Sequence, residues 1–188
     1  MPCSGLKSAA SFRFGADANV PSSRDEKTGL PIHSLYGTAA QRRPTDETLA
    51  GIDAIVIDLQ DIGTRFYTYM TTMAYVMQEA AARKIKVVVF DRPNPIGGVQ
   101  IEGPALDPAA TSYVGYLPAM PIRHSLTLGE IAQLFNGEKK IGVDLTVIKL
   151  RNWRRDAWFD ETSQPWINPS PNMRTLYAAT LYPGIGAM

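Results

Sequence analysis

Carboxylate, amide and guanidinium side chains gather where two apolar runs of the chain stop. The first group is Asp58, Gln60, Asp61, Arg65 and Tyr67, and the second is Asp91, Arg92 and Asn94. Aspartate and amide side chains can bind the hydroxyl groups of a sugar. These residue types suit a carbohydrate better than a nucleotide.

A later loop adds aromatic and amide groups of the same kind. It contains Trp153, Trp158 and Trp166 and ends in a turn-rich run that supplies Asn168, Ser170 and Asn172. Tryptophan faces cover sugar rings, although packing is the other interpretation of these residues. Asn94 and Asn172 lie next to prolines, so they equally fit turns.

The two histidines give no metal-binding pattern. His33 precedes a turn and His124 precedes a predicted helix, and neither has a companion at metal-ligand spacing. A lone histidine in such a place is more often a hydrogen-bonded structural group. His124 is nevertheless included among the candidate binding residues.

Alternating strands and helices must position these groups. The continuous apolar runs 54–57 and 87–90 predict strands buried on both faces. Between them, Met70, Met73 and Met77 recur at helical spacing and indicate a core stripe on a helix over 66–83. Strand, helix and strand make a βαβ unit with a right-handed crossover.

The remaining pattern extends the same alternation. We expect a short strand at 31–36, a helix over 45–49, a helix capped by Ser125 or Thr127, a strand at 145–150 and a last helix at 173–180. Residues 1–30 and 93–124 read as loops. The fold class is therefore α/β, a Rossmann-like, mostly parallel sheet covered by helices and incomplete. Ligands of such sheets bind outside the carboxyl ends of the strands, at a switch in strand order.

Composition excludes several classes of protein. The 188 residues include 45% hydrophobic and 20% charged residues, which excludes a disordered chain. A net charge of +1 is too small for a nucleic-acid binder or for a surface that binds anionic lipid. No apolar run is long enough to span a membrane, and no signal peptide is visible. Cys3 is the single cysteine, so the sequence allows neither an internal disulfide nor a cysteine zinc site.

Familiar cofactor and nucleophile motifs are missing. The sequence has no glycine-rich dinucleotide fingerprint, no phosphate-binding loop and no Gly-x-Ser-x-Gly elbow. No cofactor is predicted.

Five strings in the sequence carry a family resemblance. They are IDLQDIGTRFYTY from Ile57, VFDRPNPIGG from Val89, IEGPALDP from Ile101, RHSLTLGEIA from Arg123 and PWINPSPNM from Pro165. Together they resemble the NamZ-type exo-β-N-acetylmuramidases, bacterial cell-wall glycoside hydrolases, over about Gly15 to Gly184. The resemblance implies a Rossmann-like domain with a smaller carboxyl-terminal lobe and an active site between them. It also implies release of non-reducing-terminal N-acetylmuramic acid from muropeptides, in the periplasm or outside the cell.

The chain departs from that family near its start. A Glu-His-Gly motif, whose glutamate is the expected catalytic acid, is replaced by Ala9, Ala10 and Ser11. We therefore expect a fragment with little activity, with an aberrant or poorly ordered segment at 1–19 and a partial catalytic domain at 20–188 that lacks the second lobe. The oligomeric state is not predicted.

The remaining carboxylates, Asp58, Asp61 and Asp91, are the candidates for the second catalytic role. An equally compatible interpretation is that Asp58 and Asp91 cap helices or pair with arginines. Arg65, Arg92 and Arg123 are candidates to bind the lactyl carboxylate of muramic acid, with Arg92 first because it follows Asp91 and precedes a proline.

Two other functions stay open. The first is a noncatalytic carbohydrate-binding remnant that retains the aromatic and amide loops. The second is a metal-dependent phosphohydrolase built on Asp58 and Asp61, which lacks an evident third acidic ligand and a phosphate-binding lysine.

Overall fold

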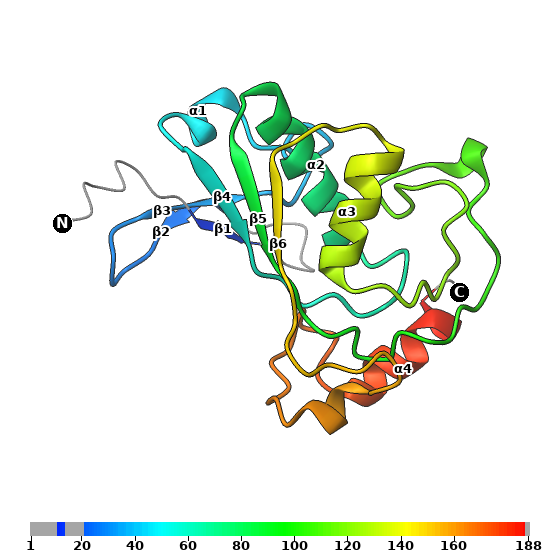
Figure 1. Ribbon diagram of the computed structural model, residues 1–188. Coiled ribbons are helices and arrows are strands. Elements are labelled where there is room, and N and C mark those ends of the chain that lie inside the picture. The colour runs from blue at the N-terminus through cyan, green and yellow to red at the C-terminus, as the bar shows by residue number, and fades with distance from the viewer. Residues whose placement is uncertain (1–10, 14–20, 187–188) are drawn as a thin grey trace.

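A parallel sheet of three strands forms the centre of the molecule (Figure 1). The computed structural model describes residues 11–13 and 21–186. Strands β4 (Ala54–Ile57), β5 (Lys86–Phe90) and β6 (Leu145–Ile148) lie in the order β4-β5-β6, and both neighbouring pairs are parallel. The predicted α/β class is confirmed.

Helices α2 (Tyr69–Ala82) and α3 (Leu128–Glu138) connect these strands and cover one face of the sheet (Figure 1). Right-handed crossovers that advance in one direction along a sheet place their helices on the same side. The predicted methionine stripe lies in this core, where Met70, Met73 and Met77 are at most 1% exposed. The residues of β5 that face them, Val87 and Val89, are fully buried.

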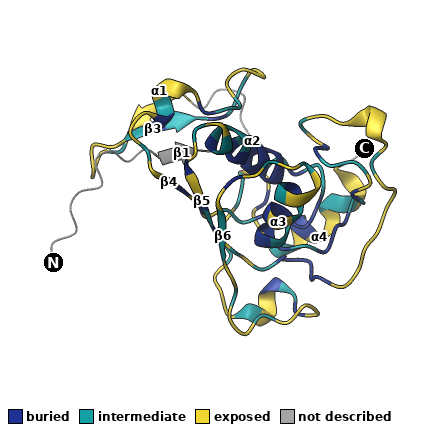
Figure 2. Ribbon diagram, turned by 45° about the horizontal axis from the view of Figure 1, so that its top comes forward, coloured by how far each residue is buried: buried dark blue, intermediate teal, exposed yellow. Residues whose placement is uncertain are grey.

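The prediction that the strands are buried on both faces is wrong. Buried and exposed residues alternate along β4 and β5, and Figure 2 shows exposed segments on the strands beside buried helices. Val56, Phe90 and Ile148 are 56%, 44% and 51% exposed. The reason is the strand order: since β4, β5 and β6 follow one another without a reversal, neither crossover helix reaches the other face.

A second, smaller sheet precedes β4. Strands β1 (Ser11–Arg13), β2 (Ser23–Arg24) and β3 (Pro31–Ser34) lie in the order β1-β3-β2, with β1 parallel and β2 antiparallel to β3. The strand expected at 31–36 is confirmed as β3. The loop expected over 1–30 contains β1 and β2, which are too short to show a period in the sequence. Residues 1–10 and 14–20, including most of the segment expected to be aberrant, lie outside the described residues.

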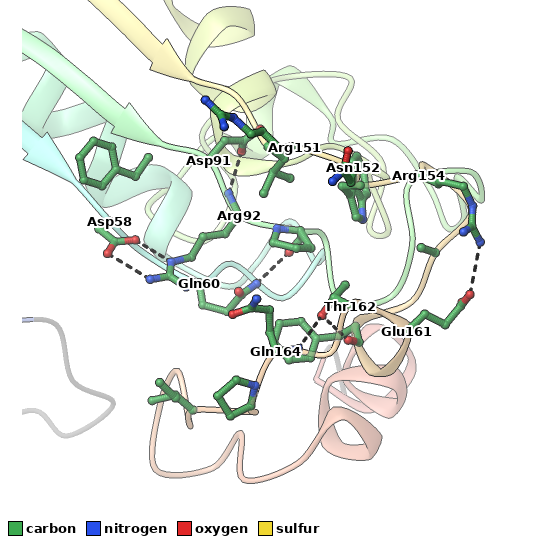
Figure 3. A pocket seen from close by; sticks show the side chains of 18 residues that line it. Asp58, Gln60, Asp91, Arg92, Arg151, Asn152, Arg154, Glu161, Thr162 and Gln164 are labelled. Atoms are coloured by element: carbon green, nitrogen blue, oxygen red, sulfur yellow. Dashed lines mark hydrogen bonds and ion pairs between the residues drawn. The ribbon is translucent and has the colours of Figure 1, made fainter.

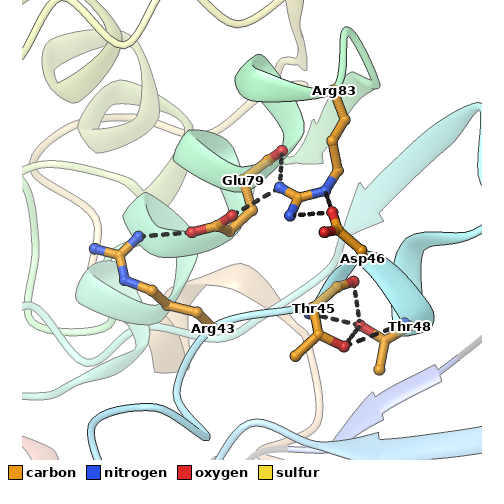
Figure 4. Close-up of polar contacts among 6 residues, drawn as sticks. All are labelled: Arg43, Thr45, Asp46, Thr48, Glu79 and Arg83. Atoms are coloured by element: carbon orange, nitrogen blue, oxygen red, sulfur yellow. Dashed lines mark hydrogen bonds and ion pairs between the residues drawn. The ribbon is translucent and has the colours of Figure 1, made fainter.

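A polar clamp ties the short helix α1 (Asp46–Leu49) to the end of α2 (Figure 4). The helix expected over 45–49 is present, and Thr45 caps it by accepting from the backbone N–H of Thr48. Arg83 lies 2.6 Å from Asp46 and 2.7 Å from Glu79, and Arg43 reaches the same glutamate at 3.1 Å. The clamp holds the chain that leads into β4 against the helix that leaves it.

The segment after β6 contains a 3₁₀ turn and an α-helix. A 3₁₀ turn, η2, spans Phe159–Thr162, and helix α4 spans Leu176–Ile185; another turn, η1 (Pro108–Ala110), interrupts the long loop before α3. The last helix was predicted to end at Thr180 but continues through Pro183. Proline removes one hydrogen bond of the final turn only, so the helix continues to Ile185, and the N–H of Gly186 donates to the carbonyl of Tyr182 at 2.8 Å.

Helix α4 packs on a separate hydrophobic cluster below the sheet. Its Ala179 is buried with Met173, Ile62, Tyr67 and Ile96. None of the described helices is long and apolar enough to cross a bilayer.

Candidate functional site

The carboxyl ends of β4 and β5 lie side by side, as the sequence predicted. In the parallel register Ile57 pairs with Val89, so Asp58 and the Asp91–Arg92 pair emerge at one edge. Arg92 donates from Nε to Asp58 at 2.6 Å and from Nη2 at 3.0 Å, a bidentate ion pair between two part-exposed side chains. Its hydrogen bonds with Asp58 raise the pKa of Arg92.

Asp91 is engaged with the start of α3. Its Oδ1 accepts the backbone N–H groups of Gly129 at 2.7 Å and Arg92 at 3.0 Å, and its Oδ2 accepts the Thr127 hydroxyl at 2.9 Å. Desolvation by burial raises the pKa of Asp91, and the hydrogen bonds oppose that shift without cancelling it. The alternative interpretation of the sequence, pairing with an arginine and capping of a helix, describes the contacts of Asp58 and Asp91.

A cavity of about 580 Å³ opens at these strand ends (Figure 3). The sequence candidates that line it are Asp58, Gln60, Asp91 and Arg92. Gln60 is held in place, because its Nε2 donates to the carbonyls of Asp61 at 2.7 Å and Pro93 at 2.9 Å. The cavity wall is therefore fixed by contacts between the loops that follow β4 and β5.

The segment after β6 completes the cavity with residues that the sequence interpretation did not select as site residues. They are Arg151, Asn152, Glu161, Thr162 and Gln164, and Arg154 lines the cavity beside them. Asn152 adopts a left-handed backbone with φ of 60°, which asparagine tolerates, and turns the chain across the strand ends. The position of β6 in the parallel sheet was the available signal, since a third strand end must meet the other two.

Four sequence candidates lie outside the cavity in a buried polar cluster, which comprises Asp61, Asn94, Arg123 and His124, each at most 8% exposed. Nδ1 of His124 accepts the N–H of Leu126 at 3.1 Å, while Nε2 lies 3.4 Å from Oδ2 of Asp61. A neutral histidine that accepts at Nδ1 carries its proton on Nε2, facing that carboxylate. His124 therefore lies between the segment before α3 and the loop after β4 that carries Asp61.

Gly63 lies where the loops of this cluster cross. Its N–H donates to Oδ2 of Asp61 at 2.8 Å and its carbonyl accepts from the N–H of His124 at 3.4 Å. Asn94 holds the third loop by donating to the carbonyl of Leu126 at 3.0 Å. These contacts join the loop after β4, the loop after β5 and the segment before α3.

The other arginine candidates are used within the loops. Arg65 donates to the carbonyls of Pro104 at 2.9 Å and Met120 at 2.5 Å, and burial lowers its pKa. Arg123 lies 2.7 Å from Glu102 and also donates to the carbonyl of Ile96.

Tyr67 and the loop at 168–172 lie near α4 rather than in the cavity. Burial, with a smaller effect of the neighbouring Tyr69, raises the pKa of Tyr67. The Tyr69 hydroxyl donates to the carbonyl of Pro169, which anchors the loop that carries Asn168, Ser170 and Asn172. These four candidates, Tyr67, Asn168, Ser170 and Asn172, are therefore not part of the cavity wall that contains Asp58 and Arg92.

The cavity offers hydrogen-bonding groups beside apolar surface, and this combination suits a polyhydroxylated ligand. Phe90, Trp153, Phe159 and Ile167 supply the apolar part of its wall. Within the described ranges, no three histidine, cysteine or acidic side chains are placed to hold a metal ion.

One known protein family matches most of the chain. The family described as "Exo-beta-N-acetylmuramidase NamZ, N-terminal" matches residues 9–177, which is most of the sequence. The chain belongs to this family. The resemblance inferred from the five sequence strings is confirmed.

Relatives of the NamZ family are similar to the chain in sequence and in structure. The "Peptidoglycan beta-N-acetylmuramidase NamZ" of Bacillus subtilis (strain 168) is 49% identical over 171 residues, which is 91% of this chain and 41% of that protein. Two crystal structures of DUF1343 family proteins from Bacteroides fragilis NCTC 9343 superpose with TM-scores of 0.82 and 0.78, at 40% and 37% identity. They cover 87% and 94% of this chain, which spans 42% and 47% of theirs.

Proposed function

We propose that the chain functions as a glycoside hydrolase that releases non-reducing-terminal N-acetylmuramic acid from peptidoglycan fragments. The observation that carries the proposal is the 49% identity to the Bacillus subtilis peptidoglycan β-N-acetylmuramidase across 91% of the chain. The substrate is then a muropeptide, and the place of action is the periplasm or the cell exterior, where peptidoglycan lies.

The cavity at the strand ends is the proposed sugar site. Asp58 lies in its wall and accepts two N–H groups from Arg92, an arrangement that suits a carboxylate acting through its negative charge. Such a group stabilises positive charge at the anomeric carbon or orients the attacking water. Asp91 and the buried polar cluster of Asp61, Asn94, Arg123 and His124 then position the loops without touching the sugar.

The experiment is turnover of a chromogenic N-acetylmuramide by this chain, with the Bacillus subtilis relative as positive control. Asp58→Asn keeps the size of the side chain and removes its charge, so turnover should fall at least tenfold if Asp58 acts electrostatically. Glu138→Gln, an exposed substitution at the end of α3, is the matched control.

Two results would separate the alternatives. Release of the chromophore by the wild-type chain supports the hydrolase. Quenching of tryptophan fluorescence by muropeptides without any release would favour the noncatalytic carbohydrate-binding alternative. Release at the rate of the Bacillus subtilis relative would overturn the expectation that the chain has little activity.

A further inference from the structure

Among the described residues, three arginines line the cavity, and two of them already face carboxylates. Arg92 donates to both oxygens of Asp58. Arg154 lies 3.1 Å from Asp156 and 3.4 Å from Glu161. A ligand carboxylate brought to either guanidinium would approach a like charge, which opposes its binding.

Arg151 is different. It follows β6 at the cavity rim, and within the part of the chain that the structure describes its guanidinium makes no hydrogen bond or ion pair. The amide side chains of Asn152 and Gln164 are also without partners among those residues. In Figure 3 Arg151 and Asn152 lie above the cavity and Gln164 lies below it.

Unused donors and acceptors of this kind favour a charged, polar ligand. The carboxylates that line the cavity are each committed to groups of the protein: Asp58 to Arg92, and Asp91 to the start of α3. Glu161 accepts from Arg154 and from the backbone N–H of Trp158. One guanidinium charge therefore remains available, beside two amides that can take hydroxyl or acetamide groups.

We propose that Arg151 binds the carboxylate of an acidic saccharide in this cavity and determines its selectivity for acidic over neutral sugars. This inference rests on the proposed function, because N-acetylmuramic acid differs from N-acetylglucosamine by a lactyl carboxylate. The planar guanidinium binds a carboxylate through two parallel hydrogen bonds. The assignment replaces Arg92, the choice made from the sequence, since Nε and Nη2 of Arg92 are taken by Asp58.

The test is an NMR titration that measures how tightly the whole chain binds each of two monosaccharides, N-acetylmuramic acid and N-acetylglucosamine. Arg151→Gln removes the positive charge at the cavity rim. It should lower the affinity for N-acetylmuramic acid about tenfold to a hundredfold, the range for a hydrogen bond to a charged group. Binding of N-acetylglucosamine should be unchanged. Arg151→Lys should recover part of the lost affinity, because lysine restores the positive charge without the two parallel N–H donors of the guanidinium.

Arg174→Gln is the matched control. Arg174 is exposed, donates to the carbonyl of Pro171, and is not part of the cavity wall. Its loss of charge should leave the affinity for both sugars unchanged, which separates a local contact from the general effect of one fewer positive charge.

The outcomes distinguish this inference from the proposed function. Equal affinity of wild type and Arg151→Gln for N-acetylmuramic acid, or an equal loss for both sugars, would overturn the role of Arg151 while muramide turnover could stand. Selective loss without any muramide turnover would support Arg151 and favour the noncatalytic carbohydrate-binding alternative over the hydrolase. Binding of neither sugar by the wild-type chain would overturn the inference together with the proposed sugar site.

Discussion

Single side chains at the strand ends link neighbouring elements of the fold. Asp91 shows this best, because three donors hold its carboxylate, although burial raises its pKa. The position of Thr127 explains the arrangement: its hydroxyl donates to Asp91 and accepts from the N–H of Glu130, so the residue after β5 is linked to the cap of α3. A sequence alone displays the aspartate but not the helix that it reaches.

The raised pKa of Asp91 predicts a pH dependence of stability. As pH rises through the ordinary aspartate value of 3.8, the unfolded chain releases this proton while the folded chain retains it up to the raised pKa. The unfolded state then binds fewer protons, so the contribution of Asp91 to the free energy of unfolding falls with rising pH across that window. Below 3.8 both states are protonated and the contribution is constant.

Urea denaturation of the wild type and of Asp91→Asn between pH 3 and pH 7 measures this effect. We expect the stability of the wild type relative to the variant to decline from about pH 4 upward, since all other titrating groups cancel in the difference. A difference that rises over the same range would show that the three hydrogen bonds outweigh burial and that the pKa of Asp91 is lowered.

At the scale of elements, the positions of the parallel strands and of the helices beside them followed from the sequence, whereas the face that each strand buries did not. Apolar runs and methionine spacing located β4, β5 and α2 because these signals are local. Which face a crossover helix covers depends on strand order, a property of residues far apart in the chain. The apolar run that became β6 was predicted to continue to Leu150, but the strand ends at Ile148.

Matched substitutions on the two faces of the sheet test this burial pattern. Val89→Thr places a hydroxyl in a site that is fully buried and should cost roughly 1–3 kcal/mol of unfolding free energy. Val56→Thr, at a site 56% exposed, should change it by about 0.5 kcal/mol or less. Both variants keep a β-branched side chain of the same size, so strand preference is unchanged.

Chemical denaturation of both variants supplies the measurement. Equal losses would mean that the face of β4 that carries Val56 is covered in solution, and sedimentation of the wild-type chain would then show whether a second copy covers it.

At the scale of the whole molecule, the buried polar cluster and Gly63 form one joint, which connects the sheet, the cavity wall and the start of α3. The sequence candidates Asp61, Asn94, Arg123 and His124 were selected as possible chemistry, and the structure places them in this joint. Their burial follows from contacts between loops some 30 to 60 residues apart, which spacing within one segment does not reveal. The part of the site that could be predicted is the edge shared by Asp58 and Arg92, because two parallel strands require it.

Gly63 at the centre of this joint provides the last prediction. Its φ is 81°, and a Cβ there would lie 2.4 Å from Oδ1 of Asn94 and 2.7 Å from Cγ1 of Ile96. Gly142 has a similar φ of 70° but nothing within 4 Å of the same position. Gly142→Ala therefore measures the backbone cost of a left-handed alanine, about 1–2 kcal/mol before the gain from a less flexible unfolded chain. Gly63→Ala adds overpacking of about 1–3 kcal/mol in the joint.

Urea denaturation of both alanine variants should show the larger loss for Gly63→Ala. Because the displaced Asn94 also fixes the loop beside the cavity, the same variant should weaken saccharide binding, whereas Gly142→Ala should not. Equal destabilisation by the two substitutions would show that Asn94 and Ile96 move aside freely, and the joint would then not hold the three loops as a rigid unit.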